Sequence, residues 1–239
     1  SGVTTADNII NFIRGEEVSG MRTRLMDVQD GGVLVSKVWK YGDPIHSPPT
    51  LVGVPQSNFH LAYGDASYLS FFQQYRHRRQ VIYVGANDGM LHAFNAGYYH
   101  AGDDPTTASV ESGWFTKNQL DNSSGKDLGE ELWGYVPYEL LPQLRFLTQS
   151  DYSHVYFVDL KPKVFDARIF TPDADHPGGW GTILIGGFRM GGSCGQCSAG
   201  SGAPPMTVNI GGTNRTFYSA YFVLDVTNPE ASPKLLMSF

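Results

Sequence analysis

The sequence predicts an all-β fold of the β-propeller class, with one short helix near its beginning. The 239 residues include 28 glycines and 14 prolines, and only 17% of the residues are charged. This composition is typical of many short strands joined by tight turns. A strand–turn–strand pattern also recurs along the chain, and hydrophobic residues make up 41% of it. The chain can therefore bury a substantial core, and a helical bundle is disfavoured.

The predicted helix lies in Thr5–Gly15, where a capping residue is followed by isoleucines and a phenylalanine, and then by a terminating glycine. After it, period-two strand patterns take over, separated by clusters of proline and glycine. We expect the β domain to begin near Gly32. This divides the chain into a lead-in segment, residues 1–32, and a partial propeller domain, residues 33–239.

The clearest hairpin is Val81–Ala96, where two apolar strands flank Asn87-Asp88-Gly89. Asp-Gly supplies the positive φ angles that a tight hairpin turn requires. A related pattern returns in Thr182–Phe188 and, after a long insertion, in Tyr221–Val226. Further strands are expected at Leu132–Tyr138, His154–Leu160 and Lys163–Ile169. Repeated hairpins are typical of a propeller, because each small sheet must bury its faces against its neighbours.

Two polar, glycine-containing stretches interrupt the strand pattern, Gly97–Glu130 and Arg189–Arg215. Both are interpreted as loops that emerge from hairpins, and long loops on a rigid scaffold often carry binding surfaces. An idle insertion is the equally open alternative for either one. The candidate partner-binding residues in them are Asp103, Asp104, Trp114, Phe115, Arg189 and Met190.

The charge pattern argues against nucleic acid as a partner. With 17 basic and 23 acidic residues, the net charge is −6, which disfavours extended contact with phosphates or anionic lipid. We interpret the basic run Arg76–Arg79 as a solvated turn before a strand. No apolar run approaches the ~20 residues of a membrane span, so membrane insertion is not expected.

No metal or catalytic site is predicted. Asp173–Gly178 has oxygen ligands at the first and third positions of an EF-hand loop, but Pro177 and Leu184 occupy positions that need ligands, so a proline–glycine turn explains the segment better. The spacing of Cys194 and Cys197 fits either a short disulfide or a free pair of thiols, and zinc binding is the weaker interpretation because no second pair follows. The histidines share no spacing, and most are expected to be ordinary strand or loop residues.

Several stretches together resemble the PilC/PilY family of type IV pilus biogenesis proteins. In chain order they are Asn8–Gly15, Asp43–Thr50, Val81–Ala96, Glu131–Leu141, Gly181–Gly187, Ala220–Pro229 and Pro233–Leu236. Met237 departs from the pattern, which has tryptophan there. The resemblance implies a modified propeller with quinoprotein-like repeats, of which this chain is the early, incomplete part. It also implies that the family's calcium loop lies downstream, so no cofactor is expected in this chain.

The resemblance further implies a secreted bacterial protein at the cell surface that supports pilus assembly and adhesion. Its partners would be pilin or minor pilins, a host or surface ligand, and the remaining propeller segment or a second copy. Secretion favours the disulfide between Cys194 and Cys197. One alternative is a pyrroloquinoline quinone dehydrogenase, which would need a cofactor site and a base that are not recognisable here. The other is a purely structural propeller.

Overall fold

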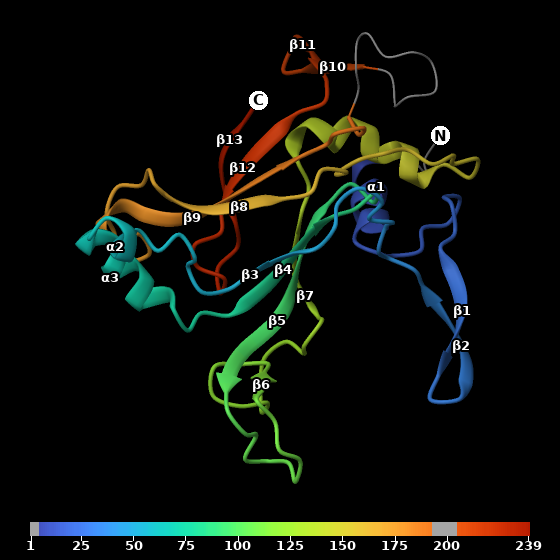
Figure 1. Cartoon of the computed structure of the whole chain (residues 1–239). Coiled ribbons are helices and arrows are strands. Elements are labelled where there is room, and N and C mark those ends of the chain that lie inside the picture. The colour runs from blue at the N-terminus through green and yellow to red at the C-terminus, as the bar shows by residue number, and fades with distance from the viewer. Residues whose placement is uncertain (1–4, 193–204) are drawn as a thin grey trace.

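The computed structural model describes residues 5–192 and 205–239, and its centre consists of two antiparallel sheets (Figure 1). Blade 1 comprises β3 (Thr50–Val52), β4 (Gln80–Gly85), β5 (Leu91–Ala101) and β7 (Glu131–Tyr135). Blade 2 comprises β8 (Lys163–Arg168), β9 (Trp180–Gly187), β12 (Tyr221–Asp225) and β13 (Lys234–Ser238). In each blade the strands lie side by side in chain order. This up-and-down arrangement is that of propeller blades and confirms the predicted fold class.

The two predicted hairpin patterns are confirmed as paired strands. β4 pairs with β5, and the turn between them places Gly89 at a φ of 96°, a conformation that glycine adopts without steric cost. β9 pairs with β12 in the same antiparallel sense, although residues 188–220 separate the two strands. The sheets therefore repeat one design with connections of very different length.

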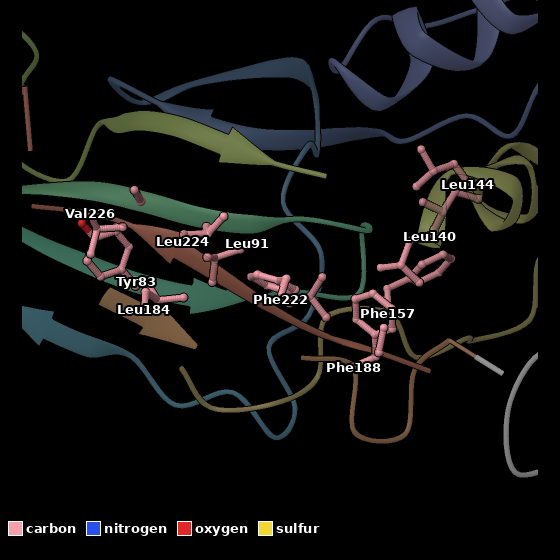
Figure 2. Packing of buried hydrophobic residues seen from close by; sticks show 14 of the residues in the cluster. Tyr83, Leu91, Leu140, Leu144, Phe157, Leu184, Phe188, Phe222, Leu224 and Val226 are labelled. Carbon is pink, nitrogen blue, oxygen red and sulfur yellow. The ribbon is translucent and has the colours of Figure 1, made fainter. Parts of the chain in front are cut away.

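The main core lies between the two blades (Figure 2). Tyr83 and Leu91 of blade 1 face Leu184, Phe222 and Leu224 of blade 2, and all five side chains are almost completely buried. Further buried members at one end are Leu140, Leu144, Phe157 and Phe188. Because the two inner faces share one apolar cluster, neither blade can be solvated alone without exposing the core of the other.

The expected strand at His154–Leu160 is wrong. This segment instead bridges the two blades: the N–H of Val158 donates to Ala86 O at 3.3 Å, and that of Leu160 donates to Gly187 O at 3.2 Å. A strand pairs with one neighbour, whereas here successive donors point to different sheets. Gly85 permits the bridge, since a Cβ at that position would collide with the carbonyl oxygen of Val158.

The predicted first helix is confirmed as α1 (Ala6–Ile13), and the Thr5 hydroxyl accepts a hydrogen bond from Asn8 N. The expectation that only strands follow it is wrong. The further helical segments are α2 (Phe59–Ala62), α3 (Ala66–Tyr75) and the 3-10 segments η1 (Tyr138–Thr148) and η2 (Pro177–Gly179). η1 also replaces the last part of the strand expected at Leu132–Tyr138.

Helix α3 has an apolar face that was not recognised in the aromatic stretch before β4. Tyr68, Phe71 and Tyr75 recur at helical spacing and pack with Trp180 in a second, smaller cluster. Asp65 caps the helix by accepting hydrogen bonds from the N–H groups of Ser67 and Tyr68. The helix therefore has a normal start signal and a normal buried face.

Two small hairpins lie outside the blades, β1 (Leu25–Asp30) with β2 (Val33–Val38), and β10 (Met206–Ile210) with β11 (Thr213–Phe217). Gly31 and Gly32 form the turn of the first one, so the expected boundary at residue 32 falls inside a hairpin, and the division into two segments stays a prediction. Within residues 5–192 and 205–239, no helix is long and apolar enough to cross a membrane.

Candidate functional site

The first predicted binding loop, residues 97–130, contains a short two-stranded ribbon between irregular segments, and we call the whole stretch the arm. The far half of β5 extends beyond blade 1 and pairs with β6 (Gly113–Thr116), so that Tyr99 lies opposite Phe115 and His100 opposite Trp114. The interpretation of this stretch as a loop alone is therefore wrong. The ribbon carries four of the predicted residues, Asp103, Asp104, Trp114 and Phe115, at the lower end of the molecule in Figure 1.

Each face of the arm carries an aromatic pair. The rings of Tyr99 and Phe115 lie 5.4 Å apart, and these side chains are 51% and 43% exposed. On the other face the Trp114 ring stacks on His100 at 4.4 Å, and His100 also bonds to Thr116 through Nε2 at 2.8 Å. The Tyr99–Phe115 pair is thus the accessible aromatic surface of the arm, and such side chains are enriched in protein interfaces.

The two predicted aspartates hold the tip of the arm in shape. Asp104 Oδ1 accepts hydrogen bonds from Thr106 N at 2.8 Å and from Thr106 Oγ1 at 2.7 Å. Asp103 Oδ1 accepts from Glu111 N at 2.8 Å. These are turn-stabilising contacts of short polar side chains, so both carboxylates support the loop conformation.

A buried polar cluster anchors the base of the arm to both blades. Asn95 donates to Lys126 O at 2.8 Å and accepts from Arg79 Nη1 at 2.7 Å. Arg79 also donates to Lys117 O at 2.9 Å, and it reaches both carboxylate oxygens of Glu230, in the β12–β13 connection, at 2.7 and 3.1 Å. A bidentate pair of this kind fixes orientation as well as distance, so the arm leaves the protein in a defined direction.

The prediction of a solvated turn at Arg76–Arg79 is wrong for its last two residues. Arg79 is 7% exposed. Arg78 donates through Nε to Gly53 O at 2.6 Å and through Nη1 to Thr227 O at 2.9 Å. The charge run therefore joins blade 1 to blade 2, because the carbonyls and the carboxylate that satisfy these guanidinium groups come from both.

Of the second predicted loop, the part that forms β10 and β11 lies at the opposite end of the molecule from β6 (Figure 1). Arg189 has a positive φ of 53°, and its Nη1 lies 4.0 Å from Asp159 Oδ2. The buried Asp159 is paired more closely with His46 Nδ1, at 2.7 Å. Met190 is partly exposed beside it. The six predicted residues therefore do not form one surface, and Cys194 and Cys197 lie outside the described residues.

The prediction that most histidines are ordinary strand or loop residues did not identify a buried ion cluster around His92 in blade 1. His92 contacts Glu131 Oε1 through Nδ1 at 2.5 Å and Asp88 Oδ2 through Nε2 at 3.0 Å. Burial lowers the pKa of His92, but the hydrogen bonds to Asp88 and Glu131 outweigh it and raise the pKa to about 9. Glu131 reaches His92 because β5 pairs with β7, and no sequence motif near either residue indicates this contact.

Blade 2 contains a second histidine between two carboxylates. His176 contacts Asp173 Oδ1 through Nδ1 at 2.8 Å and Asp225 Oδ2 through Nε2 at 3.0 Å, while its ring stacks on Phe170. Asp173 Oδ1 also accepts from the backbone N–H of Asp175 and His176. The predicted turn is confirmed, and the Asp173 carboxylate stabilises it by accepting these backbone hydrogen bonds. Within the described ranges, no group of three or more His, Cys, Asp or Glu side chains is arranged to hold a metal ion.

Parts of this chain match a protein family and several known proteins. A family model described as the PilY1 beta-propeller domain matches residues 41–198. The Type IV pilus biogenesis factor PilY1 homolog of Xylella fastidiosa (strain Temecula1 / ATCC 700964) is 28% identical over 189 residues, which are 77% of this chain and 12% of that protein. The Type IV pilus biogenesis factor PilY1 of Pseudomonas aeruginosa (strain UCBPP-PA14) is 30% identical over 190 residues, again 77% of this chain and 12% of that protein.

Among solved structures, the crystal structure of the Pseudomonas aeruginosa PilY1 C-terminal domain matches with 26% identity and a TM-score of 0.41. The match covers 79% of this chain and 24% of the other. The matched part of this chain thus corresponds to about an eighth of the length of its curated relatives, 12% in both cases above.

Proposed function

This chain belongs to the family of PilY1 β-propeller domains, and from that premise we propose that it is a binding module for pilus assembly and adhesion. We place its contact surface on the arm and assign it no catalytic role. The partner is a pilin or minor pilin during assembly, and a host or surface ligand during adhesion. The relatives reported above are named pilus biogenesis factors, and this similarity supports the role in assembly.

The observation that carries the proposal is the exposed Tyr99–Phe115 pair on a rigidly anchored ribbon. A binding loop that is already ordered loses less conformational entropy on association than a mobile one. Aromatic side chains with few rotatable bonds supply contact area at low entropic cost. The Arg79–Glu230 and Asn95 contacts provide this order from within the protein, and the aspartate-capped tip extends it.

Three further properties belong to the same proposal. The protein is secreted and remains associated with the bacterial pilus, Cys194 and Cys197 form a disulfide there, and calcium binds in a downstream part of the longer protein. The Asp173 turn does not contribute to calcium binding, because that carboxylate already accepts hydrogen bonds from its own turn.

The experiment introduces Tyr99→Ser with Phe115→Ser into the full-length protein in its bacterium. Both side chains are exposed, so the double substitution should change stability by no more than about 1 kcal/mol. We expect surface pili, counted by electron microscopy, or adhesion per pilus to fall at least several-fold. Pilus counts report on assembly, whereas adhesion per pilus reports on ligand binding.

The matched control is Val33→Ser with Leu34→Ser on the β1–β2 hairpin, which removes two similarly exposed apolar side chains elsewhere. This control should leave both readouts unchanged. Normal piliation and normal adhesion in the arm variant would contradict the proposal. An equal loss in both variants would contradict the placement of the contact surface on the arm.

A further inference from the structure

A half-open pocket of about 570 Å³ lies beside blade 1, where α1 and η1 approach the outer face of β5 and β7. We call it the α1 pocket. Its volume falls within the roughly 300–1,000 Å³ that is typical of small-molecule sites. It is separate from the arm and is not needed for the function proposed above.

The walls of the α1 pocket are mainly apolar. Ile10 of α1 and Leu141 of η1 line it and remain 46% and 48% exposed. Phe94 of β5 and Val136 after β7 are also part of the apolar lining and are half-buried. Covering such surface with an apolar ligand is favourable by about 25 cal/mol per Å² removed from water.

The charged side chains that line this pocket differ in whether they form an ion pair. The carboxylate of Glu131 is engaged by His92. Arg14 and Lys40 also line the pocket and are exposed, and within residues 5–192 and 205–239 neither forms an ion pair at 4.0 Å or less, although Lys40 lies near enough to Glu131 to contribute to lowering the pKa of that carboxyl. The stem of Lys40 packs across Gly15, the residue after Arg14, and any Cβ on Gly15 would collide with it. The Lys40 stem therefore lies against the backbone that follows Arg14 at the end of α1.

We propose that the α1 pocket binds a linear fatty carboxylate, with its chain against Ile10, Leu141 and Phe94 and its carboxylate held by Arg14 and Lys40. A planar guanidinium matches a carboxylate in geometry as well as charge. A neutral chain of equal length would fill the same walls but would gain no charge interaction with Arg14 or Lys40. A cationic amphiphile would be repelled by them. The ligand class thus follows from one apolar wall and two exposed cations, of which only Lys40 has a carboxylate, that of Glu131, near it in the described residues.

The test is a calorimetric titration with dodecanoate and, in parallel, with dodecanol, both below their micelle concentrations. It is carried out on this chain and on the longer protein. We expect dodecanoate to bind at least about tenfold more tightly than dodecanol. Arg14→Gln with Lys40→Gln should reduce dodecanoate binding to the level of dodecanol, whereas Leu141→Ser should weaken both ligands.

Arg76→Gln with Lys234→Gln is the matched control, because it removes one arginine and one lysine charge at exposed positions away from the pocket. It should leave dodecanoate binding unchanged. Equal affinity for the two probes, or an unchanged affinity in the Arg14/Lys40 variant, would overturn the proposal. Binding by this chain but not by the longer protein would also overturn it, since the pocket would then be covered by the rest of the protein itself.

Discussion

The two blades each hold a histidine between two carboxylates, but they assemble the cluster in different ways. In blade 1, His92 lies within β5, and Glu131 reaches it only because β7 pairs with β5. In blade 2, His176 lies in the β8–β9 connection, and Asp173 is part of its own turn. The first cluster therefore depends on a completed sheet, whereas half of the second forms locally.

The connections differ in the same manner. Five residues, 86–90, join β4 to β5, whereas residues 188–220 join β9 to β12. Blade 1 carries its insertion one strand later, as the arm between β5 and β7. The inner faces nevertheless meet in one shared core. The four-stranded plan thus determines the packing, while the insertions determine which surface is presented to a partner.

The shared core is tested most severely by Phe222→Ala. Phe222 is completely buried between the blades, and removal of a buried phenylalanine costs about 3–5 kcal/mol. Chemical denaturation should show this loss in one transition that involves both blades. Tyr221→Ala, at the half-exposed neighbouring position, should cost less than about 1.5 kcal/mol. Two separate transitions in the protein would show that the blades are independent.

The difference between the histidine clusters is tested by pH. His92 has its pKa raised from 6.5 to about 9, so its contribution to stability is complete below pH 6.5 and is lost as pH rises through 9. The shift corresponds to roughly 3 kcal/mol. The acids that face it are Asp88 and Glu131, and Lys40 lies near Glu131.

Stability should therefore fall between pH 6.5 and 9 in the wild type, and this slope should disappear in His92→Gln. The measurement is the free energy of unfolding by urea at several pH values. His176→Gln is the matched variant in blade 2; because His92 is intact in it, the slope that His92 contributes should remain. A slope that survives in His92→Gln would show that another group is responsible.

The contact that joins the arm to blade 2 is tested by Glu230→Gln. Its side chain is 53% exposed, so loss of the ion pair with Arg79 should cost only about 1 kcal/mol. Hydrogen exchange in residues 116–130 should become faster, because the anchor of the arm is weakened. Glu111→Gln changes an exposed carboxylate at the arm tip and should leave the exchange of these residues unchanged. Unaltered exchange in the Glu230 variant would show that the contacts of Asn95 and Arg79 within blade 1 and the arm are sufficient to hold the arm.

Features that depend on neighbouring residues were predictable from the sequence. The Asp-Gly turn, the capped first helix and the apolar strands that pair as β4–β5 and β9–β12 all follow from local conformational preferences. The position of the arm was also predictable as an insertion, although its ribbon structure was not. The helical spacing of the aromatic residues in α3 could also have been recognised from the sequence, since Tyr68, Phe71 and Tyr75 lie on one helical face.

Tertiary structure alone decided the features whose partners are distant in sequence. Arg78 and Arg79 became buried links because carbonyl and carboxylate groups from both blades surround them. The segment at residues 157–160 failed to form a strand because its N–H groups are satisfied by two different sheets. His92 became part of an ion cluster only when β7 joined β5. Local sequence preferences thus determined the first helix, the Asp-Gly turn and the paired strands β4, β5, β9 and β12, whereas burial and hydrogen-bond satisfaction across the assembled blades determined the role of polar side chains such as Arg79 and His92.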